Sequence, residues 1–418
     1  MDENVTPVQN AVMRIDFYYD IVCPYAYLGS IQIEALAKRC NAELRWHPVL
    51  LGGIFRSVGG SQSPMTQMSA PRARHNALDL QRWADLWGAP LNFPAEHPRR
   101  TVNTMRLLTG TPHDDRPALT HRLYRAYWED GLDLADRDVL NAVALEAGAD
   151  PALIDSPAAR QGLFDATAEA VAHGAFGVPA MVVDGTLWWG QDRMNFVEKS
   201  LGGRWPGLPG RLRNGAKTIR FFHDFASPFS YLAATQIERV AAKHGARLEW
   251  CPILLGGLFR EIGTADVPLF QMSEAKRSYV TRDLSDWANW WDEPFAFHSH
   301  FPLRTIAPLR VALVEPSLTM PLYRAAWAED RAIDSPDVLG DIIESNGFDA
   351  RDIFARTQSE EVKATLRANT QLAQDVGACG VPTFQVLPTD GERPFLIWGQ
   401  DRISMLEQAL NGWSPACG

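Results

Sequence analysis

Two short stretches of the chain place a polar side chain where a nucleophile or a bound anion could be stabilised. The first contains Cys23 followed by Pro24, and the second contains Ser227 followed by Pro228. Each stretch follows a run of β-branched and aromatic residues and precedes apolar residues at helical spacing. The pattern predicts a strand, a tight turn and a helix with proline at its first position, so that Cys23 or Ser227 is the N-cap.

The expected position at a helix N-terminus defines the chemistry of these two side chains. Free backbone N–H groups and the helix dipole favour negative charge there. We therefore expect the pKa of the Cys23 thiol to fall from about 8.5 to well below 7.5, which would make it largely a thiolate. The Ser227 hydroxyl cannot ionise and can only donate a hydrogen bond to an anion. The alternative for Ser227 is a plain helix cap.

The two stretches belong to a unit that is written twice in the sequence. Cys23 and Ser227 are 204 positions apart, and similar offsets relate several longer motifs. A constant offset with few gaps indicates a duplicated domain. The paired motifs are Leu50-Leu-Gly-Gly-Ile-Phe-Arg56 with Leu254-Leu-Gly-Gly-Leu-Phe-Arg260, Gly177-Val-Pro179 with Gly380-Val-Pro382, and Gly190-Gln-Asp-Arg193 with Gly399-Gln-Asp-Arg402.

The order of elements in each unit predicts an α/β fold. Strand, helix and strand come first, then a long helical stretch with tryptophans, then two strands and a last helix. This is a thioredoxin-like fold with a helical insertion between its βαβ and ββα halves. We predict a first domain over residues 12–203, a linker over 204–216 and a second domain over 217–413.

Composition narrows the class of partner. The 418 residues carry a net charge of −10 and contain no basic run, so nucleic acid and anionic membranes are not expected partners. No stretch approaches the ~18 uninterrupted apolar residues of a membrane span, and the start of the chain has no secretory pattern. We expect a soluble, cytoplasmic protein.

The five cysteines predict neither a disulfide framework nor a metal site. Their number is odd and no Cys-x-x-Cys occurs. Cys379 precedes a Gly-Val-Pro motif and is interpreted as a small apolar core residue, the alternative being a role near Ser227. Cys40, Cys251 and Cys417 are interpreted as packing or tail residues.

The other two repeated motifs could bind a ligand. A cis Val-Pro bond at Pro179 and Pro382 would leave the valine backbone free to pair with an extended peptide. A trans proline on an edge strand is the alternative. In Gly-Gln-Asp-Arg, glutamine and aspartate could hydrogen-bond a ligand's ammonium and carboxylate, although aspartate at a helix start is often only a cap.

Both halves resemble the 2-hydroxychromene-2-carboxylate isomerase family, which is related to kappa-class glutathione transferases and DsbA-like thiol oxidoreductases. The resemblance covers nearly the whole chain, once per half. The residues that carry it are Ser227-Pro-Phe-Ser-Tyr-Leu, Pro252 to Arg260, Phe301-Pro-Leu-Arg-Thr305, Gly380-Val-Pro-Thr-Phe384 and Trp398-Gly-Gln-Asp-Arg402.

The resemblance implies a glutathione site and a glutathione-dependent isomerase or transferase for an unsaturated, aromatic-derived substrate. It implies that Ser227 steadies the glutathione thiolate, that Val381 and Pro382 pair with the cysteinyl part, and that Gln400 and Asp401 hold the γ-glutamyl end. The further residues implied for cofactor binding are Arg260 and, in the first half, Val178, Pro179, Gln191, Asp192 and Arg56.

Some residues depart from that pattern. Cys23 replaces the serine of the isomerases, and Ala26 stands where a second cysteine would close a disulfide. A monothiol oxidoreductase centred on Cys23 is therefore an alternative function, and a non-catalytic ligand-binding tandem is another. Single-unit relatives are generally dimeric, so we predict that the two halves form an intramolecular pseudo-dimer.

Overall fold

The computed structural model of the chain describes residues 12–59, 68–208, 217–388 and 393–415. The chain divides into two compact units: unit 1 comprises residues 1–62 and 83–207, and unit 2 comprises residues 63–82 and 208–418. Cys417 and residues 209–216 of the predicted linker lie outside the described residues. The predicted boundaries of the domains and linker therefore stay a prediction.

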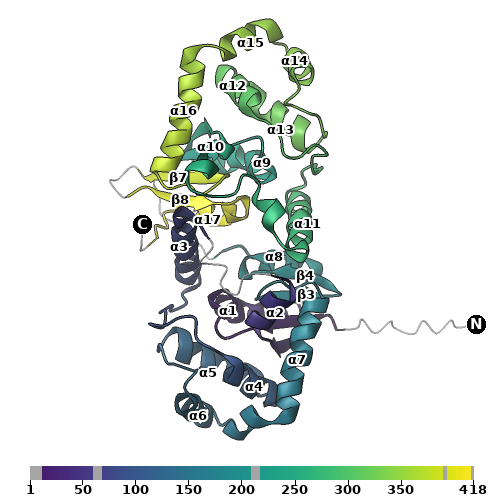
Figure 1. The fold of residues 1–418 in the computed structure, drawn as a ribbon, viewed down its shortest axis with the longest axis vertical. Coiled ribbons are helices and arrows are strands. Elements are labelled where there is room, and N and C mark those ends of the chain that lie inside the picture. The colour runs from purple at the N-terminus through teal and green to yellow at the C-terminus, as the bar shows by residue number, and fades with distance from the viewer. Residues whose placement is uncertain (1–11, 60–67, 209–216, 389–392, 416–418) are drawn as a thin grey trace, which may run out of the picture. The chain divides into compact units, whose positions relative to one another are not determined.

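Unit 1 contains a four-stranded sheet in the order β2-β1-β3-β4 (Figure 1). β1 and β2 are parallel, and β3 runs antiparallel to both of its neighbours. A parallel pair needs a crossover connection, which α1 supplies. The elements are β1 (Arg14–Tyr19), α1 (Pro24–Arg39), β2 (Glu43–Pro48), β3 (Ala180–Val183) and β4 (Thr186–Trp189). This order confirms the predicted thioredoxin-like fold.

The remaining helices of unit 1 form the predicted insertion and flank the sheet. Figure 1 shows α4, α5 and α6 gathered away from the sheet, with α7 running back to it. The helices are α2 (Leu51–Ser57), α4 (Val102–Gly110), α5 (Arg116–Trp128), α6 (Arg137–Glu146), α7 (Pro157–Ala172) and α8 (Met194–Ser200). Trp128 at the end of α5 is fully buried, as expected of a core residue.

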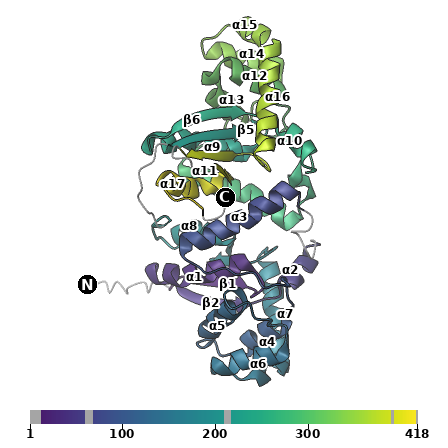
Figure 2. The same cartoon turned by 90° about the vertical axis from the view of Figure 1, so that its left-hand side faces the viewer.

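Unit 2 repeats this plan with a sheet in the order β6-β5-β7-β8. Figure 2 shows α16 extending from the α12–α15 group to the sheet. The strands are β5 (Lys217–His223), β6 (Arg247–Pro252), β7 (Thr383–Pro388) and β8 (Phe395–Trp398). The helices are α9 (Pro228–Lys243), α10 (Leu255–Glu261), α11 (Glu274–Trp291), α12 (Ile306–Val314), α13 (Thr319–Trp327), α14 (Pro336–Ser345), α15 (Ala350–Thr357), α16 (Glu360–Asp375) and α17 (Ile403–Leu410).

One segment does not follow the order of the repeats. Helix α3 (Ala70–Trp87) comes from the first repeat, yet its residues up to Arg82 belong to unit 2 and only its last turn belongs to unit 1. The compact units therefore differ from the two contiguous predicted domains in this helix. Among the described residues, no helix is long and apolar enough to cross a membrane.

Candidate functional site

The Ser227 site is built on the loop between β5 and α9. Ser227 is the N-cap of α9, Pro228 occupies the first turn, and the Ser227 hydroxyl oxygen accepts a hydrogen bond from the Ser230 N–H at 3.2 Å. The same hydroxyl donates to the Val381 carbonyl at 3.3 Å. Ser227 is 4% exposed. The expected helix cap is therefore present, and its hydroxyl also reaches the Gly-Val-Pro motif.

The equivalent Cys23 site has a similar backbone but a different hydrogen-bond pattern at the helix N-terminus. Cys23 is the N-cap of α1, makes no side-chain cap bond, and donates from Sγ to the Val178 carbonyl at 3.1 Å. Burial raises the pKa of the Cys23 thiol to about 12, outweighing the opposite effect of the Tyr25 and Ala26 N–H groups. The expectation of a lowered pKa was wrong, because the cost of charging a buried sulfur exceeds the benefit of a helix N-terminus.

Both Gly-Val-Pro motifs contain the predicted cis bond, Val178-Pro179 in unit 1 and Val381-Pro382 in unit 2. In the described part of the chain, neither valine N–H forms a hydrogen bond with another residue. Among the described residues, each valine carbonyl accepts only one weak bond, from the Cys23 thiol in unit 1 and from the Ser227 hydroxyl in unit 2. A backbone donor therefore remains available beside each side chain.

The Gly-Gln-Asp-Arg motifs adjoin the cis prolines. The Gly399 N–H donates to the Pro382 carbonyl at 3.0 Å, and the Gly190 N–H donates to the Pro179 carbonyl at 2.9 Å. Both glycines have positive φ, and a Cβ on either would lie 2.5 Å from Oδ1 of the following aspartate, Asp401 or Asp192. Glycine is thus required here, because the carboxylate folds back over it.

The glutamines of these motifs are almost fully buried. Gln191 is 2% exposed and Gln400 is 3% exposed. The Nε2 amide of Gln191 is buried without a hydrogen-bond partner among the residues that the structure describes. A buried hydrogen-bond donor without a partner is energetically costly. This amide is therefore a candidate contact for a polar ligand.

The structure thus brings together the three predicted motifs in each unit. A cofactor-binding role for Arg56 and Arg260 stays a prediction. Both arginines are exposed on α2 and α10, and neither forms a side-chain hydrogen bond or ion pair with another predicted site residue in the described ranges.

A buried aspartate that was not among the predicted site residues holds the Ser227 loop. Asp224 accepts hydrogen bonds from the Thr305 hydroxyl at 2.6 Å, the Ala226 N–H at 3.0 Å and the Leu255 N–H at 2.8 Å. Burial raises the pKa of Asp224 to about 6 against the effect of these three bonds. The loop is also held by Trp327, whose Nε1 donates to the Phe225 carbonyl at 2.8 Å.

Unit 1 has the same arrangement around Asp20. Its carboxylate accepts from the Thr101 hydroxyl at 2.7 Å and from the Leu51 N–H at 2.9 Å, and burial raises its pKa. The signal in the sequence was the common offset of 204, which relates Asp20 to Asp224 and Thr101 to Thr305.

Helix α3 adds a second group of unpredicted residues to the Ser227 site. Asp79 forms a bidentate ion pair with Arg402, with both oxygen–nitrogen distances at 2.9 Å. Arg82 donates to the Leu396 carbonyl, and the rings of His75 and Trp398 pack edge to face at 5.5 Å. Burial lowers the pKa of His75 to about 4, so this imidazole is neutral.

Cys251 and Cys379 are buried packing residues. Cys251 lies in the hydrophobic core of unit 2 together with Val381, and Cys379 is 4% exposed. Burial raises the pKa of both thiols to about 12. The described residues contain no cluster of histidine, cysteine or carboxylate side chains suited to a metal ion.

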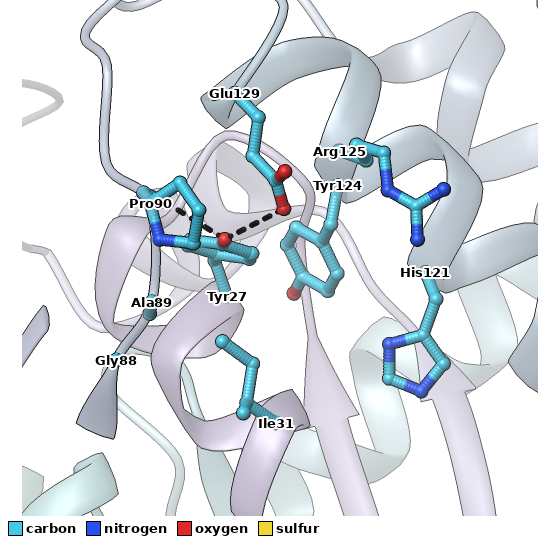
Figure 3. A pocket seen from close by; sticks show the side chains of 9 residues that line it. All are labelled: Tyr27, Ile31, Gly88, Ala89, Pro90, His121, Tyr124, Arg125 and Glu129. Atoms are coloured by element: carbon cyan, nitrogen blue, oxygen red, sulfur yellow. Dashed lines mark hydrogen bonds between the residues drawn. The ribbon is translucent and has the colours of Figure 1, made fainter.

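A separate cleft of about 500 Å³ lies in unit 1 between α1, α5 and the segment after α3 (Figure 3). Figure 3 shows the Tyr27 hydroxyl within reach of two acceptors, the Pro90 carbonyl at 2.9 Å and Glu129 Oε1 at 3.1 Å. None of the predicted site residues lines this cleft.

Comparison with known proteins gives the same fold twice. The DSBA-like thioredoxin domain family matches residues 14–202 and again 218–411. A 2-hydroxychromene-2-carboxylate isomerase of Sphingobium xenophagum is 30% identical over 191 residues, covering 45% of this chain and 97% of that protein.

Two further proteins are similar over the length of one repeat. Glutathione S-transferase kappa 1 of Rattus norvegicus is 27% identical over 212 residues, covering 46% of this chain and 92% of that protein. A solved structure of a 2-hydroxychromene-2-carboxylate isomerase is 26% identical, covers 46% of this chain and 95% of its own, and superimposes with a TM-score of 0.40.

Proposed function

Because the chain belongs to the DSBA-like thioredoxin domain family and carries that domain twice, we propose that it is a glutathione-dependent isomerase or transferase. The proposed substrate is an unsaturated, aromatic-derived small molecule. The observation that carries the proposal is the Ser227 hydroxyl, which sits at the start of α9 and contacts the Val381 carbonyl beside Gln400 and Asp401.

The residues of this site fit a glutathione molecule. Val381 offers a backbone N–H that is unused among the described residues, in the place where an extended peptide could pair. Gln400 and Asp401 offer a donor and an acceptor for the γ-glutamyl end. The unsatisfied amide of Gln191 at the equivalent place in unit 1 supports a polar ligand at this motif.

Bound glutathione would supply a thiol nucleophile. Ser227 would donate its hydroxyl hydrogen to the ligand's thiolate. Its present bond to the Val381 carbonyl is long, at 3.3 Å, so redirecting the hydroxyl loses little. The dipole of α9 adds to this effect, and together they would lower the pKa of the bound thiol. Asp224 and Trp327 would keep the loop in place.

The buried Cys23 thiol does not favour the monothiol oxidoreductase, since thiol exchange needs the thiolate. The pairing of the two halves as a pseudo-dimer and a cytoplasmic location stay predictions.

Titration calorimetry with glutathione, followed by kinetics with 2-hydroxychromene-2-carboxylate, tests the proposal. Ser227→Ala should lower kcat/KM about 10- to 100-fold, because a hydrogen bond to a charged group contributes roughly 1.5–3 kcal/mol. Cys23→Ala, which removes the equivalent atom in unit 1, should change it much less. A wild-type protein that takes up no glutathione, or a fully active Ser227→Ala variant, would contradict the proposal.

A further inference from the structure

The cleft between α1, α5 and the segment after α3 in unit 1 has the composition of a small-molecule site (Figure 3). Its volume of about 500 Å³ lies within the usual range of roughly 300–1,000 Å³ for such sites. The apolar part of the wall includes Ile31 and the rings of Tyr27 and Tyr124, whose centres are 5.5 Å apart. Arg125 and Glu129 also line the cleft, so it offers an apolar surface together with a cation and an anion.

Three oxygen atoms meet at one end of the cleft and share a single hydrogen. The Tyr27 hydroxyl lies 2.9 Å from the Pro90 carbonyl oxygen and 3.1 Å from Glu129 Oε1 (Figure 3). A tyrosine hydroxyl has one hydrogen to donate, whereas a carbonyl and a carboxylate only accept. Within the described ranges, no other group donates to these two acceptors. The three oxygens therefore suit an ammonium, which carries three donors.

The second repeat shows that the tyrosine does not need this carboxylate. Tyr231 of unit 2 donates to the Pro294 carbonyl, as its counterpart does in unit 1. Ala328 occupies the position in unit 2 that Glu129 occupies in unit 1. The fold of this region is thus kept with alanine at that position, which favours a ligand-binding role for Glu129 over a structural one.

Arg125 supplies a positive charge on the other side of the cleft. It is one helical turn from Glu129, a spacing at which opposite charges often pair. Figure 3 shows instead that the Glu129 carboxylate is directed toward Tyr27, whereas the Arg125 guanidinium lies on the side of His121. In the part of unit 1 that the structure describes, the Arg125 side chain forms no ion pair or hydrogen bond. The two opposite charges of the cleft therefore face different groups.

The other carboxylates next to the cleft are engaged by other side chains. Glu34 Oε1 lies 3.2 Å from His121 Nε2, and Asp130 Oδ2 lies 3.6 Å from the Arg122 guanidinium. Arg125 is exposed, so its guanidinium can reach a ligand in the cleft.

From this geometry we propose that the cleft binds a small zwitterion, an α-amino acid with an aromatic or branched apolar side chain. The oxygens of Tyr27, Pro90 and Glu129 bind the ammonium, Arg125 binds the carboxylate, and Ile31 and the tyrosine rings contact the side chain. Residues one helical turn apart have Cβ atoms about 5–6 Å apart, which suits a ligand whose two charges are close together. The site is independent of the proposed function, because no residue proposed for glutathione lines it.

Calorimetry with the full chain and L-phenylalanine as the probe tests the proposal. Glu129→Ala, which introduces the residue of the second repeat, and Arg125→Gln should each raise Kd about 10- to 100-fold, because a hydrogen bond to a charged group contributes roughly 1.5–3 kcal/mol. The control Arg122→Gln alters an arginine of the same helix that does not line the cleft, and it should leave Kd unchanged. Melting temperatures show whether each variant is folded, and Glu129→Gln keeps the side-chain shape while removing the charge.

Two further probes separate the two ends of the site. 2-Phenylethylamine lacks the carboxylate, so its Kd should rise with Glu129→Ala and stay unchanged with Arg125→Gln. 3-Phenylpropionate lacks the ammonium, so the opposite pattern is expected.

Three results would overturn the proposal. The first is a wild-type protein that takes up none of the three probes at millimolar concentration. The second is a folded Glu129→Ala or Glu129→Gln variant that binds L-phenylalanine as tightly as wild type does. The third is an equal loss for all three probes in both the Glu129 and the Arg125 variants, which would mean that the substitutions deform the cleft. None of these results bears on the glutathione site.

Discussion

The two sites of this chain have the same backbone arrangement and differ in one atom, the side-chain sulfur or oxygen at the helix N-cap. Cys23 and Ser227 are both helix N-caps, and both donate to the carbonyl of a valine that precedes a cis proline. Only Ser227 also accepts a hydrogen bond from its helix. Burial keeps the sulfur protonated, whereas the hydroxyl needs no ionisation to act as a donor.

The residues packed around the two sites also differ. In unit 1, Phe176 packs against Trp189 at 4.7 Å. In unit 2, Cys379 takes the place of that phenylalanine, and Arg72 and His75 lie against Trp398. The comparison teaches that a duplicated fold keeps its loops and prolines while the side chains around them decide the chemistry.

The largest expected difference concerns thiol reactivity. A pKa of about 12 instead of the ordinary value of about 8.5 leaves more than about 1,000-fold less thiolate at neutral pH, so native Cys23 should react very slowly with iodoacetamide. Mass spectrometry of the alkylated peptides at pH 7.5, with and without urea, measures this. Cys40 is a less buried comparison in the same unit. Rapid labelling of native Cys23 near pH 6.5 would restore the expectation drawn from the sequence.

The next effect concerns the Asp79–Arg402 pair. Asp79→Asn leaves a largely buried guanidinium with one carboxylate fewer, so we expect unit 2 to lose about 3 kcal/mol of stability. The estimate is at the low end because Asp401 still contacts Arg402. Urea unfolding monitored by circular dichroism measures the loss. Asp155→Asn, which breaks an exposed pair with Arg137, should cost less than about 1 kcal/mol; equal losses would refute the assignment.

A third effect depends on pH and on Asp224. Its folded pKa of about 6 exceeds the unfolded value of about 3.9, so the folded state retains the proton between these values. The stability this gives is complete below pH 4 and is lost as pH rises through 6. The free energies of unfolding of wild type and Asp224→Asn, measured by urea titration, should therefore converge from pH 4 to pH 7 by up to about 3 kcal/mol. A difference in free energy of unfolding that grows with pH would show that the hydrogen bonds lower the pKa of Asp224 more than burial raises it.

The smallest effect is expected when the N-cap residues of the two helices are exchanged. Ser227→Cys removes a cap acceptor from α9 and should cost about 1 kcal/mol of stability. Cys23→Ser supplies such an acceptor to α1 and should cost nothing. Thermal unfolding of both variants measures the loss of stability. Equal losses would contradict the described difference between the two helix N-termini.

Much of the fold could be predicted from the sequence because the same structure-determining motifs occur in both repeats. Proline after the cap, Gly-Val-Pro and Gly-Gln-Asp-Arg each dictate a backbone geometry, and their common offsets identified the duplicated domain. The cis prolines and the contacts of Ser227 followed from these signals.

Two features could not be derived in this way. The charge state of Cys23 depends on its burial, which comes from packing and not from the helix start. The sequence did not indicate a role for α3. His75, Asp79 and Arg82 recur at helical spacing, and polar residues in this pattern usually form a helix face exposed to solvent. All three are buried in the structure, where they contact groups more than 300 positions away in the sequence.

The assignment of residues 63–82 to unit 2 has a genetic consequence. A gene shortened to its second half would encode Arg402 without Asp79, and Trp398 without Arg72. The second half of the chain therefore depends on contacts with residues that the first half of the gene encodes. We expect substitutions at codons 79 and 402 to be tolerated mainly as pairs.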